Sequence, residues 1–162
     1  MEVTELQKQV DAVEWYHEFD FPNGVKARSR GPDAADHRKL WTFITTALDT
    51  VDFTDKTVLD IGCWDGYWSF YAERRGAARV LATDDASQNW SRSRGLSLAK
   101  KLLGSKIETK TDVSIYELGK LNRTFDVISV SASTITWWTH LMPSPRSGID
   151  ATRDRSWCSR AT

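Results

Sequence analysis

Three aspartates and two glycines stand where apolar, strand-like segments of this chain end. The segment "VLDIGCWDG" contains Asp60, Gly62 and Gly66, and Asp84 and Asp112 end the next two such segments. Glycine permits a tight turn and a close approach of the backbone to a ligand. A carboxylate at the end of a second strand can accept hydrogen bonds from both ribose hydroxyls, and one at the end of a third can accept from an adenine amine. The five residues together predict a nucleoside-binding site.

The turn between Gly62 and Gly66 reads G-C-W-D-G. A dinucleotide site would favour G-x-G-x-x-G, so the cradle for a pyrophosphate is weaker here than a nicotinamide dehydrogenase needs. The helix predicted to start at Gly66 presents N–H groups that favour anionic or acceptor atoms. A nicotinamide enzyme is therefore the less favoured reading of the turn.

The elements that must position these residues alternate from residue 56 onward. Alternating strands and helices at this spacing predict a parallel sheet with helices on both faces, and ligands bind such sheets at the carboxyl ends of the strands. The predicted strands are 56–62, 78–84, 106–112 and 124–129, and the predicted helices are 66–76, 91–104 and a short turn at 113–121.

An N-terminal helical and extended segment precedes this region. The pattern predicts a helix over 4–14, two short extended pieces around the Pro22 and Asn23-Gly24 turn, and an amphipathic helix over 33–51. The expected apolar face of the last helix consists of Leu40, Phe43, Ile44 and Leu48.

Composition restricts the class of protein. The 162 residues suit one domain, and 22 basic against 22 acidic residues give no overall attraction to nucleic acid or anionic lipid. The two cysteines, Cys63 and Cys158, are unpatterned, so neither a disulfide framework nor a metal site is predicted. The N-terminus is charged and no apolar run reaches about 20 residues, so we expect a cytoplasmic protein without a membrane span.

Several conspicuous side chains have ordinary interpretations. The aromatic residues after the turn are more typical of packing than of a substrate platform, and "KARSR" is more typical of a solvated basic face than of a nucleic-acid site. No histidine has ligand spacing, and nothing near Cys63 marks it as a nucleophile. The aromatic residues after the turn are Trp64, Trp68, Phe70 and Tyr71, and the histidines are His17, His37 and His140.

Residues 56 to 128 resemble the front half of a class I S-adenosylmethionine-dependent methyltransferase. Asp60, Gly62 and Gly66 match the first motif, acid-x-Gly-x-Gly-x-Gly, and Trp64 departs from it where the family usually has glycine. The resemblance implies a Rossmann-like class I methyltransferase fold, with S-adenosyl-L-methionine as cofactor. It places the cofactor against seven residues, with the ribose on Asp84 and the adenine between the last two: Asp60, Gly62, Cys63, Gly66, Asp84, Asp112 and Val113. Because the cofactor supplies the reactive methyl group, no residue must be catalytic.

A narrower resemblance covers residues 15 to 128. The segments "WYHEFDFPNGV", "LDIGCWDGYWSFYAERRGA" and "KKLLG" are similar to the methyltransferases that modify 5-hydroxyuridine at the tRNA wobble position. The similarity implies a tRNA acceptor, with Lys26, Arg28, Arg30 and Trp41 at comparable positions. The alternatives are a methyltransferase for a small metabolite or lipid, and a nonfunctional fragment or cofactor-binding partner subunit. The oligomeric state, and whether the cofactor is a modified S-adenosylmethionine, stay open.

The last 34 residues, 129–162, lack any periodicity. Twelve of them are Ser or Thr and three are Trp. Read one base out of register, with one base inserted after codon 128 and permissible codons chosen, the segment begins "LCLGVYYHLVDP", which is similar to the family's sequence after strand four. We therefore expect a frameshift at or just after Ile128. The expected divisions are an N-terminal segment over 1–50, a cofactor-binding half-domain over 51–130 that is truncated after the fourth parallel strand, and an out-of-frame or disordered tail over 131–162.

Overall fold

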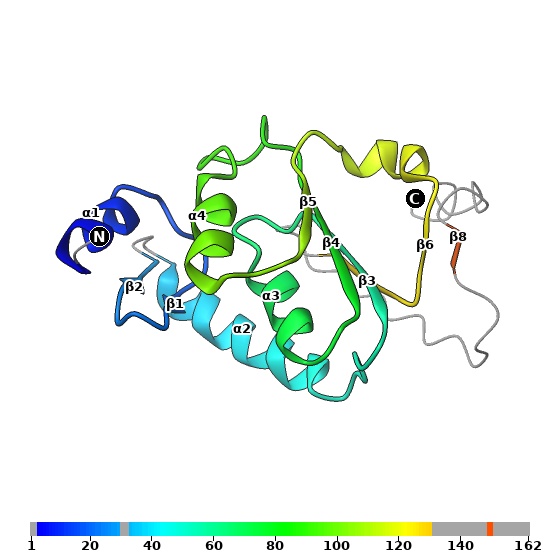
Figure 1. Ribbon diagram of the computed structural model, residues 1–162, viewed down its shortest axis with the longest axis horizontal. Helices are drawn as coiled ribbons and strands as arrows, with labels where there is room; N and C mark the ends of the chain where they lie inside the picture. The colour runs from blue at the N-terminus through cyan, green and yellow to red at the C-terminus, as the bar shows by residue number, and fades with distance from the viewer. Residues whose placement is uncertain (1–2, 30–32, 131–148, 151–162) are drawn as a thin grey trace.

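A four-stranded parallel sheet forms the centre of the protein (Figure 1). The computed structural model describes residues 3–29, 33–130 and 149–150. The strand order is β5-β4-β3-β7. If these four strands are numbered by their order along the chain, their order in the sheet is 3-2-1-4. The predicted parallel α/β fold is therefore confirmed. The strands are β3 (Thr57–Ile61), β4 (Arg79–Thr83), β5 (Glu108–Lys110) and β7 (Val127–Val130).

The apolar runs of the strands explain why the sheet is central. In β3 the side chains alternate between the two faces, and both faces are buried, as expected for a covered parallel sheet. Val58 joins one hydrophobic cluster and Leu59 joins the other. Leu59 pairs with Leu81 of β4 and with Ile128 of β7, so β3 lies between its two neighbours in register.

Three helices cover the sheet face to which Val58 points (Figure 1). They are α2 (Ala34–Leu48), α3 (Tyr67–Arg74) and α4 (Arg94–Leu103). In α2 the residues Ile44 and Leu48 are buried, as predicted, but the prediction for Phe43 is wrong because its side chain is 66% exposed. At 100° per residue Phe43 lies about 100° from Ile44 around the helix, beyond the edge of the buried stripe.

The N-terminal segment shares its core with the sheet. Its elements are α1 (Val3–Asp11) and the antiparallel pair β1 (Phe19–Asp20) and β2 (Lys26–Ala27), which confirms the predicted hairpin. The Trp15 indole N–H donates to the Val10 carbonyl at 2.8 Å and fixes the end of α1. Val10 and Trp15 belong to the same buried cluster as Val58 and Phe70.

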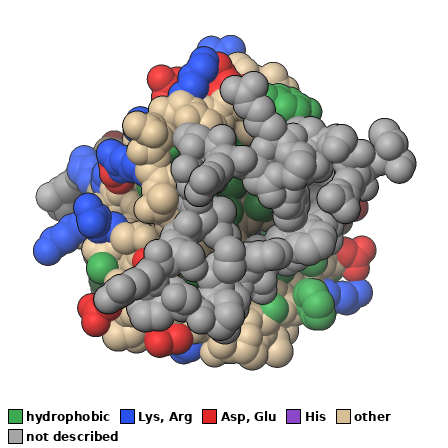
Figure 2. Space-filling view, turned by 90° about the vertical axis from the view of Figure 1, so that its right-hand side faces the viewer, with side chains coloured by type: hydrophobic (Ala, Val, Ile, Leu, Met, Phe, Trp, Pro, Cys, Tyr) green, Lys and Arg blue, Asp and Glu red, His purple; other side chains and the backbone are tan. Residues whose placement is uncertain are grey.

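The opposite face of the sheet carries a second cluster with the 3-10 helix η1 (Ile115–Leu121). It is centred on Leu59, Leu81 and Phe125. Figure 2 shows this side of the molecule, with charged side chains around its periphery. Within the described residues, β7 is the edge strand of the sheet next to β3.

The expected out-of-frame tail falls almost entirely outside the described residues. Its one described element, β8 (Ile149–Asp150), pairs antiparallel with β6 (Thr124–Phe125). Across the described ranges, no helix is both long enough and apolar enough to cross a membrane.

Candidate functional site

The glycine turn after β3 is built from three left-handed backbone positions. Gly62 has φ 67°, Trp64 has φ 57° and Gly66 has φ 81°. The Cys63 N–H donates to the Thr83 carbonyl at 3.0 Å, which ties the turn to the end of β4. Trp64 thus takes a backbone conformation that costs a non-glycine residue roughly 1–2 kcal/mol. The departure noted in the sequence therefore keeps the conformation of glycine and adds an indole.

Gly66 allows neighbouring side chains to pack closely against the turn. Its N–H donates to the Cys63 carbonyl at 2.7 Å and is therefore used inside the turn. A Cβ at this position would lie 2.5 Å from Leu96 and 2.9 Å from Phe70. The absence of a side chain lets the turn close against α3 and α4.

Replacing Gly66 with alanine should destabilise the fold strongly. Overpacking costs roughly 1–3 kcal/mol and the left-handed backbone about another 1 kcal/mol. Chemical denaturation measures the change in unfolding free energy. Gly104→Ala is the control, because Gly104 also has a positive φ but a Cβ there meets nothing within 4 Å. Equal losses in the two variants would refute the packing role.

Asp60 connects neighbouring elements through buried hydrogen bonds. Its side chain is 1% exposed and accepts hydrogen bonds from the Ser69 hydroxyl at 2.5 Å and the Ser129 hydroxyl at 2.7 Å. These bonds connect β3 to α3 and to β7. Asp60 therefore holds the elements that carry the turn.

Asp84 lies where the sequence predicts a ribose acceptor, at the end of β4. Its carboxylate accepts from the Asn89 amide at 2.7 Å and from the Asp85 N–H at 3.0 Å. Burial raises the pKa of Asp84, while the Asn89 and Asp85 hydrogen bonds oppose that rise. Two carboxylate oxygens offer about four acceptor sites, so capacity for further donors remains.

The third predicted acid, Asp112, is exposed at the same edge of the sheet. The backbones of Asp112 and Asp85 pair in an isolated antiparallel β-bridge. The next residue, Val113, donates its N–H to the backbone carbonyl of Asp84 at 3.1 Å. The structure therefore brings the predicted ribose and adenine residues together at the carboxyl ends of β4 and β5.

Cys63 contributes no accessible thiol to this edge. Its side chain is fully buried. Burial raises the pKa of the thiol well above its ordinary value, and the nearby carboxylates of Asp60, Asp84 and Asp65 raise it further. A neutral, buried thiol is neither a nucleophile nor a ligand contact, so only the backbone of Cys63 can face a cofactor.

Sequence reasoning missed the most heavily bonded carboxylate of the turn. Asp65 accepts from the backbone N–H groups of Tyr16 at 3.1 Å and His17 at 2.7 Å. Its second oxygen lies 2.6 Å from Nδ1 of His17, and both side chains are buried. The pair anchors the N-terminal segment to the turn across 48 residues of chain.

Aromatic rings surround this anchor. His17 stacks on Tyr67 with ring centroids 4.9 Å apart, and Tyr16 lies 5.8 Å from both Trp41 and Trp64. Burial raises the pKa of Tyr16, which keeps its hydroxyl neutral. Gly95 at the start of α4 allows close approach, since a Cβ there would lie 3.2 Å from Asp65.

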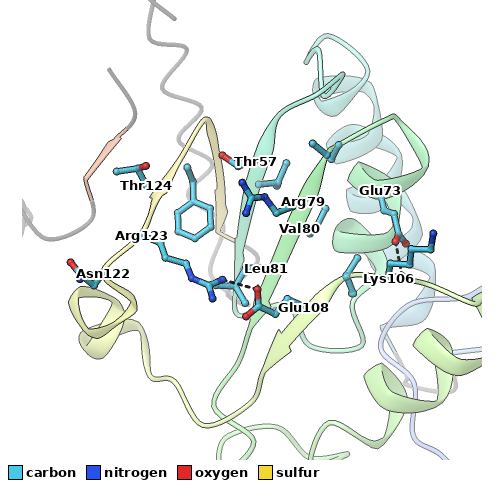
Figure 3. A pocket seen from close by; sticks show the side chains of 15 residues that line it. Thr57, Glu73, Arg79, Val80, Leu81, Lys106, Glu108, Asn122, Arg123 and Thr124 are labelled. Carbon is cyan, nitrogen blue, oxygen red and sulfur yellow. Dashed lines mark hydrogen bonds and ion pairs between the residues drawn. The ribbon is translucent and has the colours of Figure 1, made fainter. Parts of the chain in front are cut away.

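A separate cavity of about 700 Å³ lies at the opposite end of the sheet, near the amino ends of β3 and β4 (Figure 3). Among its lining residues, Arg123 donates to Glu108 at 2.6 Å, and Glu73 accepts from the backbone N–H of Lys106 at 2.7 Å. None of the predicted site residues lines it. Among the described residues, no group of three or more His, Cys, Asp or Glu side chains is placed to hold a metal ion.

Solved structures share the fold. The N-terminal domain of EvdMO1, solved in the presence of SAH and D-fucose, matches with a TM-score of 0.51 and 20% identity over 79% of this chain and 52% of that one. A ribosomal protein L11 methylase from Lactobacillus delbrueckii subsp. bulgaricus matches with a TM-score of 0.49 and 22% identity over 57% of this chain and 45% of that one. A protein from Listeria monocytogenes, proposed to be an S-adenosylmethionine-dependent methyltransferase, matches with a TM-score of 0.44 and 30% identity over 56% of this chain and 38% of that one.

The first of these matches, together with the strand order, gives the chain a Rossmann-like α/β fold. The chain spans about half or less of the length of these three structures. No protein-family model matches the sequence, and no curated protein matches it.

Proposed function

We propose that this chain binds S-adenosyl-L-methionine at the carboxyl ends of β3, β4 and β5 and belongs to a methyltransferase. The observation that carries the proposal is Asp84, a buried carboxylate with spare acceptor capacity beside the glycine turn. In an open parallel sheet, a carboxylate at this place accepts the ribose hydroxyls of a nucleoside.

The residues present fit this cofactor. Asp84 would accept from the ribose, Asp112 and Val113 would flank the adenine, and the backbone from Gly62 to Gly66 would border the methionine portion. The group supplies an electrophilic methyl when bound. The chain's own part is to orient and desolvate the reacting groups, since such sites act mainly by positioning. Asp60 and Asp65 serve this purpose indirectly by fixing the turn.

Equilibrium dialysis with radiolabelled S-adenosylmethionine tests the proposal. We expect saturable binding that S-adenosylhomocysteine displaces and that NAD does not. Displacement by NAD at equal concentration would favour the dinucleotide reading instead, and the absence of any saturable binding would refute the proposal.

The pH dependence of this binding follows from Asp84. The ribose hydroxyls require an ionised acceptor, and burial raises the Asp84 pKa above its ordinary value of 3.8. Affinity should therefore be full at neutral pH and fall as the pH drops, with its midpoint above 3.8. Dialysis over a falling pH series, restricted to conditions where circular dichroism shows a folded chain, measures the midpoint. A midpoint at or below the ordinary value would contradict the assignment.

We further propose a change of reading frame at or just after Ile128. The irregular composition of 131–162 supports it, together with the family-like sequence in the other frame. Ser129 and Val130 still fit β7, because Ser129 bonds to Asp60 and Val130 pairs with Ile61. These two contacts favour a position just after Ile128 rather than at it.

Resequencing the gene across codons 120 to 162 tests this proposal. An extra base at or just after codon 128 would support it as a sequencing error, and a full methyltransferase should then be expressed. If no extra base is present, the gene carries either a broken copy or a genuine short protein, and cofactor binding by the 162-residue chain becomes the next test. For the chain as written we expect weak or no methyl transfer, and normal turnover on any acceptor would contradict that expectation.

A further inference from the structure

A second cavity lies beside the glycine turn, on the side of the N-terminal segment. Its volume is about 690 Å³, within the range of roughly 300–1,000 Å³ typical of small-molecule sites. The lining residues include Trp15, Tyr16, Arg28, Asp33, His37 and Trp90.

The cavity is connected to the proposed cofactor site by direct contacts. Tyr16, which lines it, donates its N–H to Asp65 of the turn. Trp90, which also lines it, follows Asn89, whose amide donates to Asp84. One wall of the cavity is thus held by the same residues that shape the cofactor site.

The walls are aromatic and suit a flat ligand. The Tyr16 ring centroid lies 4.9 Å from that of His37 and 6.2 Å from that of Trp90. Trp64 packs edge-on against Trp90 at 4.3 Å. Trp90 is 51% exposed, which is unusual for the largest apolar side chain. Aromatic walls of this kind hold planar rings by stacking.

Four buried ring nitrogens around Tyr16 have no hydrogen-bond partner among the described residues: Nδ1 of His37, Nε2 of His17, and Nε1 of Trp41 and of Trp64. Of these four residues, His37 is the one that lines the cavity. An unsatisfied buried polar group costs about 1–3 kcal/mol. A ring compound with oxygen or nitrogen atoms at its edge would supply the missing partner of His37.

The charges around the cavity disfavour a phosphate. Asp11, Glu14 and Asp33 line it, and Arg28 is its one basic lining residue among those described. The Arg28 guanidinium already donates to Asp20 at 2.6 Å and to the carbonyls of Phe19 and Ala27. Lys26 also lies 3.8 Å from Asp20. Two of the basic residues that the sequence nominates for a tRNA acceptor are therefore already paired.

We propose that this cavity is the methyl-acceptor site and that it takes a small planar ring compound without phosphate groups. The acceptor role rests on the proposed function, whereas ring binding does not. His37 Nδ1 forms a hydrogen bond with an edge atom of the ring, with Tyr16 and Trp90 packing on the ring.

Titrations followed by the tryptophan indole N–H signals in NMR spectra test the proposal. The probes are phenol, catechol, uracil and adenine, each compared with a phosphorylated counterpart, and Trp64→Phe and Trp90→Ala assign the two signals. We expect at least one neutral ring to shift the Trp64 and Trp90 signals, and Trp90→Ala to weaken its binding at least tenfold. Tyr116→Ala is the control, because Tyr116 is an exposed aromatic residue on η1 that does not line the cavity.

Two results would overturn ring binding: no shift with any neutral ring at millimolar concentration, or tighter binding of the phosphorylated probes that weakens with salt. The second result would favour RNA. If a ring binds but S-adenosylhomocysteine does not, the acceptor role fails while ring binding stands, so the two failures are distinguishable.

Discussion

Asp84→Ala is expected to lower the affinity of the chain for S-adenosylhomocysteine at least about 100-fold, since each hydrogen bond to a charged group contributes roughly 1.5–3 kcal/mol and a ribose offers two. Calorimetric titration measures the change. Asp84→Asn, which keeps an acceptor oxygen but removes the charge, should have a smaller effect.

The loss should not reflect unfolding. Burial raises the Asp84 pKa, so the folded state binds its proton more tightly than the unfolded state. The ionised group therefore reduces stability as the pH rises through that pKa. Removing it relieves this penalty but leaves the buried Asn89 amide without its acceptor, so circular dichroism must show that the variant is folded under the titration conditions. Asp126→Asn is the control, because Asp126 lies at the opposite edge of the sheet and accepts from Thr57. Unchanged affinity in Asp84→Ala would contradict the assignment of the ribose site.

Asp65→Ala is expected to cost roughly 3–5 kcal/mol of unfolding free energy, the usual loss when one member of a buried pair is removed. The substitution leaves the N–H groups of Tyr16 and His17 and the His17 ring without their acceptor. It should also weaken cofactor binding, because the turn loses its anchor to the N-terminal segment.

A double-mutant cycle with His17→Ala isolates the side-chain pair. We expect strong non-additivity, with the double variant nearly as stable as Asp65→Ala alone. Asp36→Ala is the control: Asp36 pairs with Lys39 at 2.9 Å on the surface, and its loss should change stability by less than about 0.5 kcal/mol. Additive effects of Asp65→Ala and His17→Ala would show that the pair does not act as a unit.

The fold could be predicted from the sequence where local patterns determine it. The apolar segments predicted as strands form β3, β4 and β7, which are covered on both faces. Gly104, predicted to end a helix, ends α4 in the left-handed conformation. The hairpin around Gly24, which has φ 80°, followed from its turn residues. Phe43 was misplaced because a helical stripe is only about 100° wide and an apolar side chain at its edge can point to either side.

The site was less predictable because its key contacts join distant residues. Asp84 and Asp112 could be placed from strand ends alone. The Asp65–His17 pair could not, since nothing in the local pattern couples positions 48 residues apart. The one local sign of this pair was that an acid, Asp65, stands between Trp64 and Gly66 in the turn. An acid in a turn is ordinarily interpreted as a solvated loop residue. Trp64 likewise looked like a defect in the motif, yet its backbone keeps the left-handed conformation.

The most direct test of the account is a crystal structure of the chain grown with S-adenosylhomocysteine. We expect the ribose hydroxyls to donate to Asp84, with the adenine beside Asp112 and Val113. A nucleoside bound elsewhere, for example in the cavity near Arg79 and Glu108, or an empty crevice at saturating ligand, would contradict the claim that the carboxyl ends of these strands form the cofactor site.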